Sequence, residues 1–107
     1  MDPSLYVIET FAPHLHSVFQ VEVEPGKPLP FELTAAEPGP AHPRVLMFSL
    51  MFRGPADPVY PQRVYHLQHA ALGEMDFFLV PVARHEKGVD YQAVFNRMLK
   101  GAPAPRP

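Results

Sequence analysis

The sequence predicts an all-β fold: a small antiparallel barrel or sandwich of about six strands with a short N-terminal helical segment. Three observations predict it. Apolar and polar residues alternate with a period of two in several short segments, which is the pattern of half-buried strands. Turn-forming residues separate these segments, as in antiparallel sheets. The chain also holds 15 prolines, which helices tolerate badly because proline removes an amide donor and clashes with the preceding turn.

The first two strands are predicted to form a hairpin. Residues 19–24 alternate between apolar and polar side chains, and residues 29–35 do so again. The Pro-Gly pair at 25–26 between them is typical of a type II turn, in which glycine takes the positive φ. Pro28 and Pro30 place the start of the second strand at a sheet edge, because proline cannot donate to a strand ladder.

Two later strands carry apolar side chains on both faces. They are residues 44–53 and residues 75–82. Strands of this kind occur where both faces are covered, by the domain's own elements or by another subunit. Residues 62–69 alternate less regularly and residues 89–96 alternate clearly, which completes the set of about six strands.

Helical spacing of apolar residues is confined to the segment near 3–16, where Pro13 interrupts it. We therefore expect one or two short turns across an open end or face of the sheet. Residues 1–98 are predicted to form a single domain, since 107 residues are a typical domain length. Residues 99–107 are predicted to be a proline-rich tail, extended or disordered.

Composition argues against several classes of partner. The net charge is −2, so there is no basic footprint for nucleic acid or for an anionic membrane. No segment has the roughly 20 apolar residues of a transmembrane helix, and the N-terminus lacks the features of a signal peptide. The absence of cysteine excludes disulfides and thiolate metal sites. We expect a cytoplasmic protein that binds no nucleic acid and does not insert into membranes.

The titratable residues form no pattern that predicts catalysis, a metal site or a cofactor. His66 and His69 are three apart on a predicted strand and therefore point to opposite faces. Glu74 and Asp76 are expected to share a strand face, with Asp90 nearby across a turn, and all three are expected to face solvent. Without burial or mutual repulsion such acids keep ordinary pKa values. The sequence therefore predicts a protein that is not an enzyme.

Arg53 is the polar residue that invites attention, since it ends an apolar strand. If the strands at 44–53 and 62–69 pair, its guanidinium can hydrogen-bond loop carbonyls or pair with Glu74 or Asp76. We expect this structural role, tying down the proline-rich loop, rather than ligand binding.

Several motifs together resemble a family of small, functionally uncharacterised bacterial domains. They include Phe48-Ser49-Leu50-x-Phe52-Arg53-Gly54-Pro55, Phe78-Leu79-Val80-Pro81-Val82 and Tyr91-x-Ala93-Val94-Phe95-Asn96. Members are often encoded near proteins with phage tail-collar-like domains. The resemblance covers about residues 10–96 and carries no established activity, but the association implies a structural or assembly role.

The function expected from the sequence is therefore that of a non-catalytic structural or protein-interaction domain. It would act as a homo-oligomer or as an accessory of a phage-tail-like assembly. A small barrel has one interior, so the outer apolar stripes need another cover. We expect the N-terminal segment to cover one stripe, and a second subunit or a partner protein to cover the other. The interaction residues predicted on this basis are Met47, Met51, Phe78, Val80 and Arg53.

A small-molecule-binding β-barrel with an aromatic pocket is the alternative. It ranks lower because barrels of this size usually fill their interiors with side chains.

Overall fold

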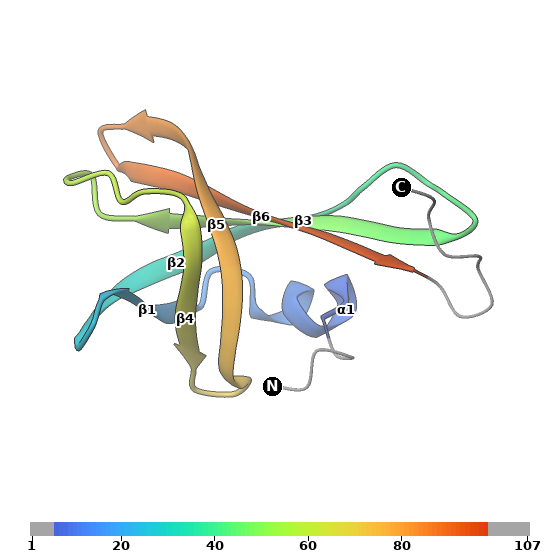
Figure 1. The fold of residues 1–107 in the computed structure, drawn as a ribbon, viewed down its shortest axis with the longest axis horizontal. Coiled ribbons are helices and arrows are strands. Elements are labelled where there is room, and N and C mark those ends of the chain that lie inside the picture. The colour runs from blue at the N-terminus through green and yellow to red at the C-terminus, as the bar shows by residue number, and fades with distance from the viewer. Residues whose placement is uncertain (1–5, 99–107) are drawn as a thin grey trace.

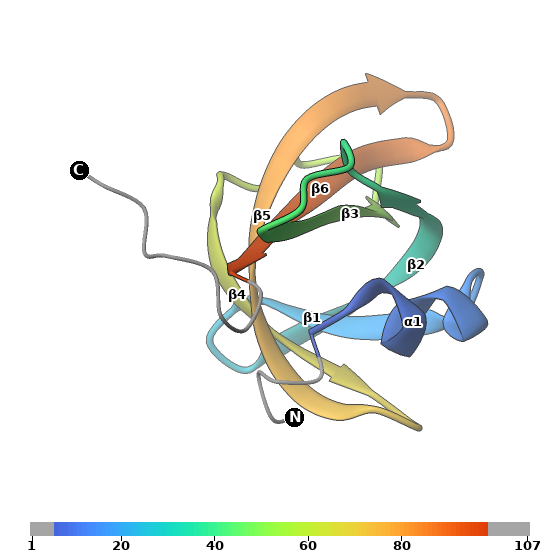
Figure 2. The same ribbon diagram turned by 90° about the vertical axis from the view of Figure 1, so that its right-hand side faces the viewer.

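The computed structural model describes residues 6–98. Six antiparallel strands close into one barrel in the order β1-β2-β3-β6-β5-β4 (Figures 1 and 2). The strands are β1 (Val18–Glu24), β2 (Lys27–Pro38), β3 (Val45–Gly54), β4 (Arg63–His69), β5 (Gly73–His85) and β6 (Gly88–Met98). The all-β prediction is confirmed, in its barrel form. The predicted tail at 99–107 lies outside the described residues.

The strand order corrects one expectation. β3 does not pair with β4: it lies between β2 and β6, and its register with β6 runs from Val45↔Met98 to Gly54↔Val89. The connection between β3 and β4 crosses one end of the barrel (Figure 1). Its length lets β4 join β5 and β1 instead. Like every strand of the closed barrel, β3 has a neighbour on both sides.

Alternation decides which side chains fill the barrel. Phe48, Leu50 and Phe52 of β3 point inward and are almost fully buried, as are Phe77 and Leu79 of β5. Further side chains of the strands, of the N-terminal segment and of the β3–β4 connection complete this core: Phe11, Phe19, Val21, Val23, Phe31, Leu33, Tyr60, Tyr65, Leu67, Met75, Val89, Tyr91 and Ala93. The interior is therefore packed with aromatic and aliphatic groups.

The N-terminal segment closes the barrel from inside. It comprises α1 (Ile8–Phe11) and a 3-10 turn, η2 (Ala12–His14). The ring of Phe11 is fully buried, and its centroid lies 6.3 Å from that of Phe48 and 5.6 Å from that of Phe77. The expected position across an open end is thus confirmed (Figure 2). The expectation that this segment covers an outer stripe is wrong, because the rings it contacts point inward.

Glycine and proline act as expected at two places. Gly26, between β1 and β2, has a φ of +77°, which glycine adopts without steric cost. Pro28 and Pro30 pair with β1, whereas the pairing of β2 with β3 begins only at Glu32. The start of β2 is therefore a local edge inside a closed barrel.

No helix among the described residues is long and apolar enough to cross a membrane.

Candidate functional site

An apolar surface lies on the outside of β3, β4, β5 and β6. We call it the outer apolar face, and it consists of Met47, Met51, Val64, Phe78, Val80 and Val94. Val64 is 62% exposed, Phe78 52% and Val94 60%, whereas the other three side chains are half-buried. Four of the sequence-predicted interaction residues, Met47, Met51, Phe78 and Val80, belong to this face.

The strand register makes the face continuous. Val64 of β4 is opposite Phe78 of β5. Val80, two residues further along β5, is opposite Gln92 of β6, and Gln92 is in turn opposite Met51 of β3. Directly opposed residues of neighbouring strands have Cβ atoms about 5 Å apart. The face therefore extends over four adjacent strands, with the uncharged Gln92 between Val80 and Met51.

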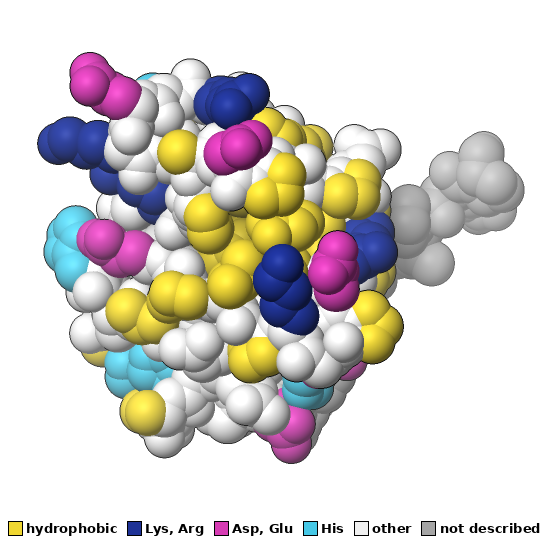
Figure 3. Space-filling view, turned by 90° about the vertical axis from the view of Figure 1, so that its left-hand side faces the viewer, with side chains coloured by type: hydrophobic (Ala, Val, Ile, Leu, Met, Phe, Trp, Pro, Cys, Tyr) yellow, Lys and Arg dark blue, Asp and Glu magenta, His cyan; other side chains and the backbone are white. Residues whose placement is uncertain are grey.

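A second gathering of hydrophobic side chains lies at the barrel end shown in Figure 3, where the connections β1–β2, β3–β4 and β5–β6 meet (Figures 1 and 3). Among the exposed large hydrophobic residues, Val59 belongs to the β3–β4 connection. Lysine, arginine, aspartate and glutamate side chains lie around and among these groups. Charged side chains therefore border the apolar group at this end of the barrel.

Arg53 lies on the same side of β3 as Met47 and Met51, at the end of the row, and its partner differs from the one expected. Its Nε donates to Oδ1 of Asp90 over 3.3 Å, and Oδ2 of Asp90 lies 3.1 Å from Nε2 of His85. The expected pairing of Arg53 with the acids at 74 and 76 is wrong, since β3 is not next to β4. Asp90, which was expected near Glu74 and Asp76, is instead opposite Ala83 at the other end of β5. Arg53 ties β3 to β6.

A buried histidine inside the barrel invites comparison with a catalytic dyad. Nε2 of His69 is 2.9 Å from Oγ of Ser17, and Oγ of Ser17 donates to the carbonyl oxygen of His14 over 2.5 Å. Nδ1 of His69 accepts from the backbone N–H groups of Ala71 and Leu72, over 3.0 and 3.2 Å. The proton of the neutral ring is therefore on Nε2 and is donated to the serine.

This direction of donation is opposite to that of an activated nucleophile, whose hydroxyl must donate to the base. His69 is also held neutral: burial lowers its pKa, and the neighbouring charge of His14 lowers it further. The arrangement fastens the turn after β4 to the segment before β1. We interpret Ser17 and His69 as a structural pair.

A polar cluster lies outside the barrel on β4 and β5. Nδ1 of His66 is 2.9 Å from Oδ1 of Asp76, and its Nε2 is 2.9 Å from Oε1 of Glu74. These hydrogen bonds raise the pKa of His66, the one to Asp76 contributing most. Two predictions are confirmed: Glu74 and Asp76 share an exposed face, and His66 and His69 point to opposite sides. The histidine between the two acids was not foreseen, although His66 and Asp76 are direct partners in the register.

Within residues 6–98, no group of three or more histidines, aspartates and glutamates is arranged so that it could hold a metal ion.

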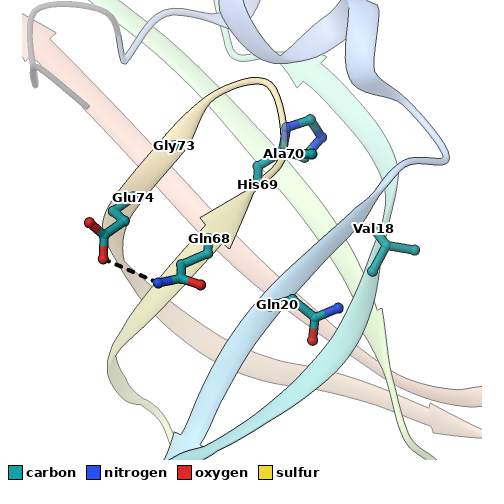
Figure 4. Close-up of a pocket in the computed structure, with 7 residues that line it drawn as sticks. All are labelled: Val18, Gln20, Gln68, His69, Ala70, Gly73 and Glu74. Carbon is teal, nitrogen blue, oxygen red and sulfur yellow. Dashed lines mark hydrogen bonds between the residues drawn. The ribbon is translucent and has the colours of Figure 1, made fainter.

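A groove of about 510 Å³ lies between β1 and β4 (Figure 4). Val18 and Gln20 of β1 form one wall, and Gln68 and His69 of β4 belong to the other. Gln68 is fixed there by donating to Oε1 of Glu74 over 3.2 Å. The groove is on the surface, outside the packed core.

Comparison with known proteins places the chain in a family. The family model described as a domain of unknown function, DUF6916, matches residues 6–95. The chain belongs to this family. The matched residues include the N-terminal segment, the first five strands and most of β6. No curated protein and no solved structure matches the chain. Resemblance to a small uncharacterised domain family is thereby confirmed.

Sequence reasoning missed two members of the outer apolar face, Val64 and Val94. Each stands in a strand whose other outward residues are polar, such as His66 and Gln68 on β4 or Gln92 and Asn96 on β6. Isolated valines of this kind are unremarkable until the barrel places Val64 opposite Phe78 and sets β6, which carries Val94, next to β5. The sequence feature that could have indicated an outward Val94 is the alternation of β6, which puts Val94 on the side opposite Ala93 and Phe95.

Proposed function

We propose that this domain is non-catalytic and works by protein–protein contact, binding a second copy of itself through the outer apolar face. The observation that carries the proposal is that Val64, Phe78 and Val94 are each more than half exposed on the outward side of three neighbouring strands, with Val64 directly opposite Phe78. Contiguous apolar surface of this kind usually marks an interaction site. Phenylalanine and methionine are also enriched at interfaces.

The charge distribution favours a second copy as the partner. Each chain has a net charge of −2, so two copies repel weakly at a distance. Between the apolar residues, however, the outward positions of β3 and β6 hold uncharged Ser49, Gln92 and Asn96. The charges of Arg53 and Asp90 at one end are paired with each other. Over β3 and β6, two copies can therefore meet face to face without bringing like charges together.

The test is the state of association in solution. We expect sedimentation velocity at micromolar concentration to report a dimer or a higher oligomer. Phe78→Glu and Val94→Glu should shift it to monomer, because each puts a charge into an apolar contact. Val18→Glu is the matched control, since Val18 is 49% exposed but lies on β1.

A wild-type protein that stays monomeric at about 100 μM, well above the micromolar constants of ordinary interfaces, would contradict the proposal. So would equal weakening by Val18→Glu. Circular dichroism of each variant separates lost association from lost folding.

The interior supports this proposal over a small-molecule-binding barrel. The rings of Phe19, Phe31, Phe52 and Tyr91 are essentially fully buried against one another and their neighbours. The groove described above lies on the surface instead. The hydrogen-bond direction at His69 likewise supports a non-catalytic role.

A finer proposal is that the domain is an accessory of a phage-tail-like assembly. It is supported by the resemblance to domains encoded near tail-collar-like proteins. Mixing the purified domain with such a neighbouring protein should give co-sedimentation that Phe78→Glu weakens. Absence of any complex at micromolar concentration would remove this part of the proposal. Cytoplasmic location and the lack of a nucleic-acid partner likewise stay predictions.

A further inference from the structure

The outer apolar face carries one aromatic ring that is open to solvent. Among the residues that the structure describes, Phe78 is the one phenylalanine or tyrosine that is more than half exposed. Its outward neighbours include Val64, its direct partner on β4, and Val80, two residues along its own strand. An aromatic side chain buries about 150–250 Å² when it is enclosed. Phe78 is therefore the strongest anchor that this face can offer to an interface.

The same face also has a groove, of about 210 Å³, over β3 and β6. It lies where two short side chains are opposite each other, because Ser49 is paired with Val94 in the strand register. Ser49 stands between Met47 and Met51 in the outward row of β3. Its hydroxymethyl group fills less space than either methionine side chain. The alternation of long and short side chains along β3 therefore leaves a hollow above Ser49.

The connection between β2 and β3 closes the groove on one side. Gly39 and Pro40 of this connection line it. The N–H of Gly39 donates to the carbonyl oxygen of Met47 over 2.7 Å. A Cβ at Gly39 would lie 2.8 Å from the Cβ of Met47, so the absence of a side chain at this position is what lets the backbone approach so closely. This wall of the groove is thus backbone, held in place by a hydrogen bond.

The size and polarity of the groove suit an aromatic ring. An apolar cavity of about 150 Å³ is large enough to hold benzene, so the groove has room for the ring of one phenylalanine. The residues that line it carry no charge, and they include Gln92 and Asn96 at its margins. A ring that enters it would remove apolar surface from water without burying an unpaired charge.

The ring and the groove belong to one face of the same chain, which points to a second copy as the partner. A two-fold interface brings the same surface of both copies together, so it requires a surface that is complementary to itself. If the two-fold axis passes between Phe78 and the groove, each copy inserts one ring and accepts one. Asp76, the outward residue before Phe78 on β5, is already hydrogen-bonded to His66 over 2.9 Å.

We infer that the groove over Ser49 and Val94 binds the ring of Phe78 from a second copy of this chain. The inference rests on the proposed self-association and adds to it the place where the ring is bound. Each dimer then has two identical ring-in-groove contacts. Because a few enclosed aromatic anchors carry most of the binding energy of an interface, these two contacts dominate the affinity.

The experiment measures association of full-length variants by sedimentation, separately and in a mixture. Phe78→Ala removes the ring, and Ser49→Phe fills the groove. Loss of one anchoring contact typically weakens binding about tenfold or more. Each variant alone lacks both contacts, so its dimer should be at least about 100-fold weaker than that of the wild type.

The mixture tests the pairing of ring and groove directly. A heterodimer of the two variants keeps one intact contact, in which the Phe78 ring of the Ser49→Phe chain enters the open groove of the Phe78→Ala chain. It should therefore form about tenfold more tightly than either variant dimer. Val18→Ala and Gln20→Phe are the matched controls, since both change exposed positions of β1, outside the face, and should leave association unchanged.

The outcomes separate this inference from the proposed function. A dimeric wild type with Ser49→Phe equally dimeric, or with no gain on mixing the variants, would overturn the ring-in-groove contact and leave self-association standing. A monomeric wild type would overturn both. Circular dichroism checks that each variant is folded. If Ser49→Phe does not fold, Ser49→Met fills the same groove with a more adaptable side chain, and the same outcomes apply.

Discussion

Replacing Phe11 by alanine tests whether α1 is an integral part of the barrel core. Phe11 is fully buried, although it belongs to a helix of four residues. Its ring stacks near those of Phe48 and Phe95, with centroids 6.3 and 6.4 Å away, and meets the edge of Phe77 at 5.6 Å. Such a short helix has little stability of its own. The aromatic contacts must therefore hold it in place.

The expected cost follows from burial and from the lost ring contacts. Truncation of a buried phenylalanine to alanine typically costs about 3–5 kcal/mol in free energy of unfolding. Aromatic pairs add about 0.5–1.5 kcal/mol each, so the upper half of that range is expected. For a domain of this size, each kcal/mol lowers the melting temperature by about 4–8 °C. At a cost of about 4 kcal/mol or more, Phe11→Ala should therefore melt at least about 16 °C below the wild type.

The assay is thermal and urea unfolding followed by circular dichroism, with Phe78→Ala as the matched control. Phe78 is 52% exposed, so at concentrations below association its truncation should cost less than about 1 kcal/mol. If Phe11→Ala prevents folding altogether, Phe11→Leu keeps most of the apolar volume and should cost about 1 kcal/mol. A cost for Phe11→Ala no greater than that for Phe78→Ala would show that α1 does not close the barrel.

Two further predictions concern packing and pH. A Cβ at Gly54 would lie 2.6 Å from the Phe31 ring, so Gly54→Ala should lower the free energy of unfolding by about 1–3 kcal/mol. In a double-mutant cycle, Phe31→Leu in the same chain should recover part of this loss, and a double variant whose loss equals the sum of the two single losses would contradict the clash. Because burial lowers the pKa of His69 in the folded state, the unfolded chain binds more protons below about pH 6.5, and stability should fall as the pH drops through that range. Between pH 7 and 5 the melting temperature of the wild type should therefore decline more than that of His69→Gln. His66 is present in both proteins, and its raised pKa acts in the opposite direction. Equal declines in the two proteins would refute the lowered pKa of His69.

Local alternation was sufficient to predict much of the fold. The six strands were foreseen from period-two patterns and turn residues, with boundaries near those observed. The inward set on β3, Phe48, Leu50 and Phe52, follows from the same rule, because successive side chains of a strand point to opposite faces. The position of the N-terminal turns at an open end was also predictable, since proline at 13 allows no longer helix.

Pairing between strands distant in the sequence was not predictable in the same way. Arg53 was assigned to the acids of β5 because β3 and β4 are consecutive, but the barrel places β3 beside β6 and gives Arg53 to Asp90. A local pattern specifies which face a side chain is on, and says nothing about which strand becomes its neighbour.

For the candidate sites, too, the sequence predicted the face of each strand, and the strand order was needed for the rest. The sequence by itself determined that Met47 and Met51 share one face of their strand and Phe78 and Val80 one face of theirs, because successive side chains alternate. Burial in the structure decided that these faces point away from the core. Only the tertiary structure decided that these residues lie on adjacent strands as one surface. It also decided that a groove lies on the same surface, over β3 and β6. Both depend on strand order and register, which are set by packing of the whole barrel.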